Sequence, residues 1–155
     1  MTPQDFVAHE ARLIDEQRFD DWLSLFAEDG RYWVPLAGAA QTDGAAFNSI
    51  ADEDHLLLSL RVQRLKNPKA HSQHPRSRCQ HVLQGSQVVA ADDAAGTCEL
   101  RTPFLYIESR GAQQVLLAGS ATHRLVRAGD AWRIRMKRVD LLDAGEPLPA
   151  IQLFP

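Results

Sequence analysis

The chain has 155 residues, of which 45% are hydrophobic and 24% charged, a size and balance typical of one globular domain with an ordinary core. Its 17 basic and 20 acidic side chains give a formal net charge of -3, which excludes the overall basic field of a nucleic-acid-binding protein. No apolar run approaches the roughly 20 residues that cross a bilayer, and the N-terminus lacks the basic start and apolar core of a signal peptide. We therefore expect a single soluble, cytoplasmic domain over residues 1–155, with no membrane partner.

The first 70 residues are expected to be mostly helical. Residues 2–5 (TPQD) combine a helix N-cap, a proline at the first helical position and a capping-box carboxylate. The residues that follow form one helical stripe: Phe6, Val7, Glu10, Ala11, Leu13 and Ile14. A second, short helix is predicted from residue 19, with Trp22 on its apolar face and Asp29-Gly30 at its end.

Residues 31–36 (RYWVPL) are aromatic and β-branched and include a proline, which predicts a short strand near a sheet edge. The small residues of 37–50 predict a loop. The acidic residues 52–54 favour the N-terminus of a third helix, which Asn67-Pro68 ends. The predicted apolar face of that helix consists of Leu56, Leu57, Leu60 and Leu65.

From residue 78 the apolar period changes to two, which is typical of strands. Short turn-forming sequences separate four segments and predict an antiparallel meander over residues 78–143. The segments are 78–91, 96–109, 113–127 and 131–143.

The last of these strands has one apolar and one basic face. Trp132, Ile134 and Met136 alternate with Arg133, Arg135 and Lys137, so we expect the first set to be buried and the second to be solvated. At Val139 the apolar parity changes, which predicts either a bulge near Arg138 or cover over both faces.

Helices followed by a curved antiparallel sheet predict an α+β domain in which the helices cover the concave face and leave a cone-shaped interior. Residues 144–155 form a C-terminal tail with three prolines and the apolar Ile151, Leu153 and Phe154. Such a segment cannot fold alone, so it must dock either on a partner chain or on the core of its own chain.

Several segments, in this order, carry a family resemblance: EARLIDEQRFDDWLSLFAEDGRYWVP, a leucine-rich helix, a Pro-Arg-Ser-Arg loop before the strand of His81, KRVDLLDA and LPAIQLFP. Together they resemble the small (β) subunit of bacterial aromatic-ring-hydroxylating dioxygenases. The resemblance implies a cystatin-like cone of the nuclear transport factor 2-like (NTF2-like) group. It also implies a non-catalytic subunit that trimerises and supports large (α) subunits in an α3β3 hexamer. The Rieske [2Fe-2S] cluster and the mononuclear Fe(II), which dihydroxylate an aromatic compound, are then expected in the large subunit.

On this interpretation the chain has no catalytic, cofactor-binding or metal-binding residue, and its functional residues lie at subunit interfaces. Aromatic residues and arginines are the usual energetic anchors of interfaces. The candidates are Trp22, Tyr32, Trp33, Arg76, Arg78, His81, Arg138 and Asp140. Arg76 and Arg78 suit bidentate pairing with carboxylates of a partner, although a plain solvated loop is the alternative for their segment.

The residues of 71–81 (HSQHPRSRCQH) also raise the question of a metal site. A Rieske cluster needs two cysteines and two histidines in close-spaced pairs, whereas Cys79 and Cys98 fall on separate predicted strands. His71 and His74 lie in a polar loop and are expected to be solvated rather than ligating.

The alternative function is a free-standing NTF2-like (SnoaL-like) pocket enzyme, such as an isomerase, dehydratase or cyclase. Cone folds can carry an acid or base in their interior with a tyrosine as hydrogen-bond donor. The candidates are Asp29, Tyr32, His55, His81 and His123. Each also has a structural interpretation: a turn aspartate, a core aromatic, a surface histidine, or hydrogen-bonded strand histidines.

Overall fold

The structure is a computed structural model and describes residues 1–36, 49–69 and 75–155. Within them the helices are α1 (Pro3–Asp15), α2 (Phe19–Ser24) and α3 (His55–Lys66). The strands are β1 (Phe26–Pro35), β2 (Ser49–Asp54), β3 (Arg78–Leu83), β4 (Gln87–Asp92), β5 (Thr97–Arg110), β6 (Gln113–Ala128) and β7 (Ala131–Leu141). None of the helices described is long and apolar enough to span a membrane.

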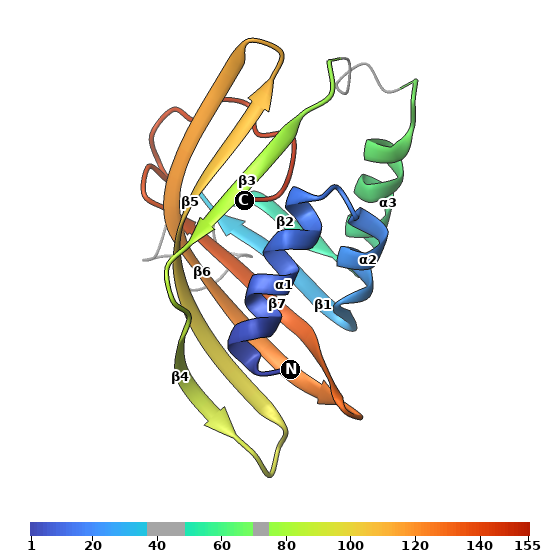
Figure 1. The fold of residues 1–155 in the computed structure, drawn as a ribbon, viewed down its shortest axis with the longest axis vertical. Helices are drawn as coiled ribbons and strands as arrows, with labels where there is room; N and C mark the ends of the chain where they lie inside the picture. The colour runs from blue at the N-terminus through green and yellow to red at the C-terminus, as the bar shows by residue number, and fades with distance from the viewer. Residues whose placement is uncertain (37–48, 70–74) are drawn as a thin grey trace.

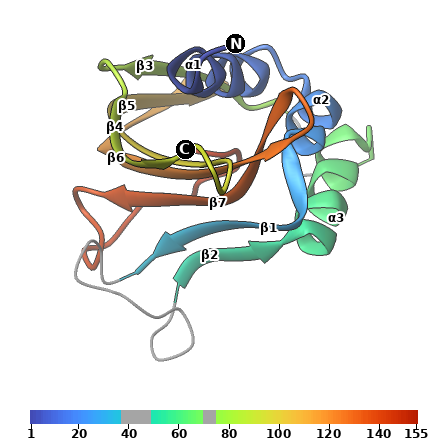
Figure 2. The same ribbon diagram turned by 90° about the horizontal axis from the view of Figure 1, so that it is seen from below.

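The strands form one curled sheet in the order β2-β1-β7-β6-β5-β3, with β4 also paired to β5. The long strands β5, β6 and β7 curve so that α1 lies across one side of the sheet, while α2 and α3 lie beside β1 (Figures 1 and 2). The predicted α+β fold with helices on a strongly curved sheet is therefore confirmed. The meander is found in β5, β6 and β7, but β1 joins the sheet through a parallel pairing with β7.

Helix α1 begins as the sequence predicts. The Thr2 hydroxyl accepts a hydrogen bond from the backbone N–H of Asp5 at 3.1 Å and so satisfies one of the free donors at the helix start. The apolar stripe of α1 is buried together with one charged member, Glu10. A buried carboxylate needs partners, and these place α1 relative to the sheet.

The predicted end of the second helix at Asp29-Gly30 is wrong. Helix α2 ends at Ser24, and Asp29 and Gly30 lie inside β1, where the register against β7 shifts between Phe26 and Arg31. A Cβ on Gly30 would lie 2.8 Å from the carbonyl oxygens of Ala27 and Ile134. Glycine is thus required because two backbones approach closely at a bulge. In the sequence, an Asp-Gly pair at such a bulge looks the same as one that ends a helix.

Residues 49–54 form the strand β2, although their acidic residues predict the start of a helix. Asp54 does cap α3, accepting from the N–H of Leu57 at 2.9 Å, but the residues before it pair with β1. The predicted apolar face of α3 is also wrong except for Leu65. The buried residues of α3 are Leu58, Val62 and Leu65, while Leu56, Leu57 and Leu60 are exposed.

Two further differences lie in the sheet. The predicted strand 78–91 is divided into β3 and β4, which both pair with β5. The predicted bulge near Arg138 lies instead at Arg135. The consecutive β6 residues Arg124 and Leu125 pair with Met136 and Ile134, so Arg135 is the extra residue between them. The extra residue turns Lys137 inward, so Lys137 is buried at 2% exposure instead of solvated as predicted.

The C-terminal tail docks on the core of its own chain. Leu153, Phe154 and Pro155 are buried, and the backbone N–H of Leu153 donates to Glu108 at 2.9 Å. Arg61 of α3 donates to the carbonyl of Leu153 at 2.7 Å. These bonds hold the tail between the helices and the sheet.

Candidate functional site

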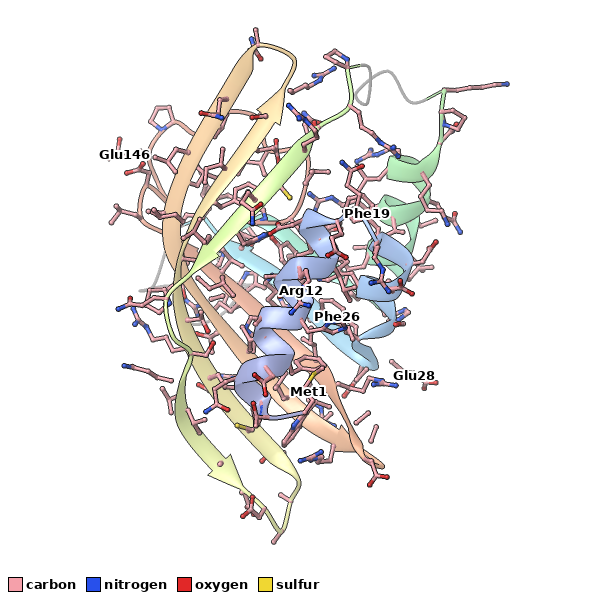
Figure 3. The ribbon with its side chains drawn as sticks, viewed as in Figure 1. Met1, Arg12, Phe19, Phe26, Glu28 and Glu146 are labelled. Atoms are coloured by element: carbon pink, nitrogen blue, oxygen red, sulfur yellow. The ribbon has the colours of Figure 1, made fainter. Side chains whose placement is uncertain are left out.

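The interior of the cone is filled with side chains. The Phe154 ring of the tail lies 4.2 Å from the Trp22 ring and 5.7 Å from the Tyr32 ring, centroid to centroid. Phe19 and Phe26 extend the same packing on the side of α2 (Figure 3). The tail therefore fills the interior of the cone beside α2 and β1.

Four side chains form a buried polar cluster beside this packing. The carboxylate of Glu10 accepts from the Trp22 indole N–H at 2.6 Å and from the Lys137 ammonium at 2.8 Å. His123 Nε2 lies 3.4 Å from the other carboxylate oxygen of Glu10. All four side chains are almost fully buried, so the cluster joins α1, α2, β6 and β7 through one carboxylate.

Burial alone would raise the pKa of Glu10, but the Lys137 ammonium and the His123 imidazole outweigh it and hold this pKa well below its ordinary value. Burial lowers the pKa of His123, and its hydrogen bond to Glu10 offsets only part of that effect. The cluster thus contains an ionised Glu10–Lys137 pair and a neutral His123 at neutral pH.

This arrangement makes stability depend on pH. We expect the free energy of unfolding to fall as the pH is lowered from about 6.5, because the unfolded chain binds a proton at His123 more readily than the folded chain. The stabilisation by the neutral His123 is complete above the ordinary pKa of histidine. It declines as the pH falls toward the lower pKa of His123 in the folded chain, by up to about 1.4 kcal/mol per pH unit. Urea unfolding between pH 5.5 and 7.5 measures it. His9→Leu, at a half-buried site of α1, should keep this slope, and an unchanged slope in His123→Leu would contradict the assignment.

A second cluster lies at the C-terminus of α1, where Asp15 faces β3. Its carboxylate accepts from the backbone N–H of His81 at 2.9 Å, and His81 Nδ1 lies 2.6 Å from Asp15 Oδ1. The Cys79 thiol donates to the same Oδ1 at 3.6 Å. Burial and the neighbouring carboxylate raise the pKa of Cys79, so its thiol stays protonated.

One ligand atom from each of Asp15, Cys79 and His81 lies within 4.8 Å of the others, which raises the question of a metal site. However, ligands of a tetrahedral zinc ion lie about 3.3 Å or more apart for metal–ligand distances of about 2.0–2.3 Å. The 2.6 Å separation of Asp15 and His81 is that of a hydrogen bond. The cluster is best described as a hydrogen-bonded anchor between α1 and β3.

The two cysteines do not fit an iron-sulfur cluster. Cys79 pairs with Glu108, ten residues along β5 from Cys98. At about 3.3 Å per residue this places the two thiols roughly 30 Å apart, too far to ligate one [2Fe-2S] cluster. His71 and His74, the other metal-ligand candidates, lie outside the described residues.

Two candidate residues of a pocket enzyme, His81 and His123, line one small cavity, but the other three do not join them there. Asp29 is exposed and pairs with Arg135 at 3.3 Å, and His55 is a half-buried residue at the first position of α3. Tyr32 is buried and donates to the carbonyl of Pro155 at 3.1 Å. Burial raises the pKa of Tyr32, so this hydroxyl remains a neutral donor to the tail.

Four of the predicted interface residues are buried within this chain. Trp22, Tyr32 and His81 belong to the interior, so they have no surface to offer a partner. Trp33 points to the other side of the sheet and is 5% exposed, because the guanidinium groups of Arg31 and Arg138 lie over its ring. An aromatic residue in a sequence marks a core as readily as an interface.

The other four predicted interface residues lie at the surface. Arg76 and Arg78 are exposed at the start of β3. Arg138 pairs with Asp140 at 3.0 Å on the outer face of β7, each side chain being 18% exposed. For these four residues a place at a subunit interface stays a prediction.

The outer face of the sheet, turned away from α1, carries exposed apolar residues. On β5, Leu105 is 44% exposed between the buried Phe104 and Tyr106, and on β3 Val82 is 52% exposed. A groove of about 830 Å³ runs over this face and is bounded by the segment after β7, whose Glu146 lies on the side away from the helices (Figure 3). Its lining includes Val82, Arg101, Pro103, Leu105, Asp140 and Leu142. We call this surface the outer groove.

Comparison with known proteins gives consistent results. The family model described as "Ring hydroxylating beta subunit" matches residues 9–144. The small oxygenase component of the p-cumate 2,3-dioxygenase system of Pseudomonas putida is 36% identical over 148 residues, covering 93% of this chain and 80% of the relative. A structure of naphthalene 1,2-dioxygenase with indole in its active site matches with a TM-score of 0.81 at 16% identity, covering 96% of this chain and 81% of that one. An NTF2-like protein with a cystatin-like fold from Novosphingobium aromaticivorans matches with a TM-score of 0.61 at 15% identity, covering 90% and 79% of the two chains.

Proposed function

The chain belongs to the family of ring-hydroxylating dioxygenase β subunits, and we propose that it acts by assembly, holding large subunits in an α3β3 hexamer around a trimer of its own copies. In this proposal the Rieske cluster and the mononuclear iron belong to the large subunit, where an aromatic substrate is dihydroxylated. The small subunit is the non-catalytic partner.

The observation that carries this proposal is the contrast between the two faces of the sheet. The inner face is closed by the chain's own tail, whereas the outer groove exposes Leu105, Val82 and Leu142. Exposed apolar surface of this kind marks protein–protein contacts. A second apolar patch lies on α3, at Leu56, Leu57 and Leu60. A subunit that contacts both its own copies and a large subunit needs more than one such patch.

Charged residues beside these surfaces fix the orientation in which a partner subunit binds. Asp140 lines the outer groove and Arg138 pairs with it, while Arg76 and Arg78 are exposed at the start of β3. Arginines of this kind can pair bidentately with carboxylates of a partner. Trp22, Tyr32, Trp33 and His81 support these surfaces from within the chain.

The alternative, a free-standing pocket enzyme, is not favoured. The interior cavity lined by His81 and His123 has a volume of about 10 Å³, whereas ligand pockets measure roughly 300 Å³ or more. A larger hollow of about 380 Å³ opens between β2, α3 and the tail. Its charged lining residues are Glu53, Arg61 and Arg64, and the one side-chain carboxylate among them, Glu53, pairs with Arg61, so the described lining offers no unpaired side-chain carboxylate as an acid or base.

The test is to replace Leu105 by Glu and to measure the native mass of the small subunit co-expressed with its large subunit. We expect the wild type to give the hexamer and Leu105→Glu to give smaller species. An unpaired carboxylate buried at an interface costs several kcal/mol, and each 1.4 kcal/mol weakens association about tenfold. Because Leu105 is partly exposed in the single chain, the variant should still fold.

Ala94→Glu, in the exposed turn between β4 and β5, is the matched control and should leave the hexamer intact. Arg78→Ala should weaken assembly less than Leu105→Glu, without changing the iron content of the large subunit. A full-size hexamer formed by Leu105→Glu would show that the outer groove is not an interface.

A further inference from the structure

Two buried histidines each have one ring nitrogen without a partner. His81 Nδ1 bonds Asp15 at 2.6 Å, and His123 Nε2 lies 3.4 Å from Glu10. His81 Nε2 and His123 Nδ1 are buried and have no hydrogen-bond partner. Orphan buried polar atoms are rare in folded proteins, so both nitrogens require an explanation.

The partnered nitrogens fix the tautomer of each ring. The Asp15 carboxylate already accepts from the His81 backbone N–H, and the Glu10 carboxylate from Trp22 and Lys137, so each also accepts from its imidazole. In a neutral ring the proton then lies on Nδ1 of His81 and on Nε2 of His123. The orphan nitrogens therefore both carry lone pairs and are both acceptors. Since two acceptors cannot bond each other, each needs an external donor.

Both rings line the same enclosed cavity, of about 10 Å³. A cavity needs about 10–15 Å³ of volume open to a water-sized sphere to hold one water molecule. Buried waters usually make about three hydrogen bonds. Lys137 also lines this cavity. Its ammonium has three N–H groups, one of which donates to Glu10 at 2.8 Å.

We infer that this cavity is a binding site for a single water molecule, which donates one hydrogen to His81 Nε2 and the other to His123 Nδ1 and accepts from the Lys137 ammonium. This molecule satisfies both orphan nitrogens with its two donors, which no apolar occupant could do. It also fits the size of the cavity.

The water joins two clusters into one network. Asp15 and His81 connect the C-terminal end of α1 to β3, while Glu10, Lys137 and His123 connect the middle of α1 to β6 and β7. With the water in place, α1 is tied to both sides of the curled sheet through one hydrogen-bonded chain. Fully satisfied buried networks of this kind specify one packing arrangement.

A crystal structure of the protein, alone or with its large subunit, tests this inference at a resolution where single waters are visible. We expect one isolated density peak within about 2.7–3.2 Å of both orphan nitrogens. Nitrogen-15 NMR of labelled histidines should show the Nδ1–H tautomer for His81 and the Nε2–H tautomer for His123. A dry cavity, or a direct bond between the two rings with one tautomer reversed, would overturn the inference.

A pair of variants sharpens the test. His123→Leu removes one acceptor, so the density peak should disappear while His81 keeps its Nδ1–H tautomer, which Asp15 holds. His9→Leu, a histidine of α1 that does not line the cavity, should keep the peak. Loss of the water in His9→Leu as well as in His123→Leu would show that the water depends on general packing and would contradict the assigned donors. If His123→Leu does not fold, the wild-type structure and spectra decide the question.

Discussion

Replacing Phe154 by Ala is expected to lower the free energy of unfolding by about 3–5 kcal/mol, the usual cost of deleting a large aromatic side chain from a core. Phe154 is 0% exposed and contacts the rings of Trp22 and Tyr32. The guanidinium of Arg61 lies over its face, 4.2 Å from the centroid. Because helices and sheet meet around this ring, the cavity cannot collapse without moving α2. Urea unfolding of the purified chain measures the effect.

Leu142→Ala provides the contrast for Phe154→Ala. Leu142 is 77% exposed, so its truncation should change the stability of the isolated chain by no more than about 0.5 kcal/mol. Equal losses in the two variants, or a small loss in Phe154→Ala, would show that the tail does not close the interior in solution.

The fold could be predicted where local signals and tertiary contacts agree. The cap and apolar stripe of α1 and the period-two strands β5 to β7 are signals of this kind. Gly30 reads as a helix end in the sequence, because residue types do not distinguish a glycine required by a chain reversal from one required by a close backbone approach. Local signals do not predict β2, because its strand structure depends on pairing with β1, which local propensity does not record.

The polar interior was visible in the sequence only in part. Glu10 fell on the apolar stripe of α1, and a charged residue in such a position signals a buried partner. That partner is Lys137. The alternation of apolar and basic residues along β7, continued through Arg135, places Lys137 on the solvated face. One extra residue at the bulge reverses every later side chain. The pairing of Glu10 with Lys137 therefore depends on an irregularity that residue types alone do not reveal.

The same buried pair accounts for the closed interior and suits the assembly role. Glu10, Lys137 and His123 occupy positions where a pocket enzyme could hold an acid or base, but here they bond one another and the indole of Trp22. The cavity left beside these groups measures about 10 Å³, which is too small for a substrate. A rigid, closed interior then presents the outer groove with a fixed shape, as an interface requires.

The role of this pair can be measured with a double-mutant cycle. Lys137→Met leaves the Glu10 carboxylate buried without its cation, which is expected to cost about 3–5 kcal/mol of unfolding free energy. Adding Glu10→Gln removes the uncompensated charge and keeps an acceptor for the Trp22 indole, so the double variant should regain part of this loss. The sum of the losses of unfolding free energy in the two single variants should then exceed the loss in the double variant by about 1–3 kcal/mol.

Lys66→Met is the matched control for Lys137→Met, since the Lys66–Asp20 pair lies at the surface with both side chains more than half exposed. Exposed ion pairs contribute little, so this variant should lose no more than about 1 kcal/mol. Simple additivity of Glu10→Gln and Lys137→Met would mean that the two charges do not depend on each other. The interior would then be held by apolar packing alone, and the large loss expected for Phe154→Ala would remain as the main evidence for a closed cone.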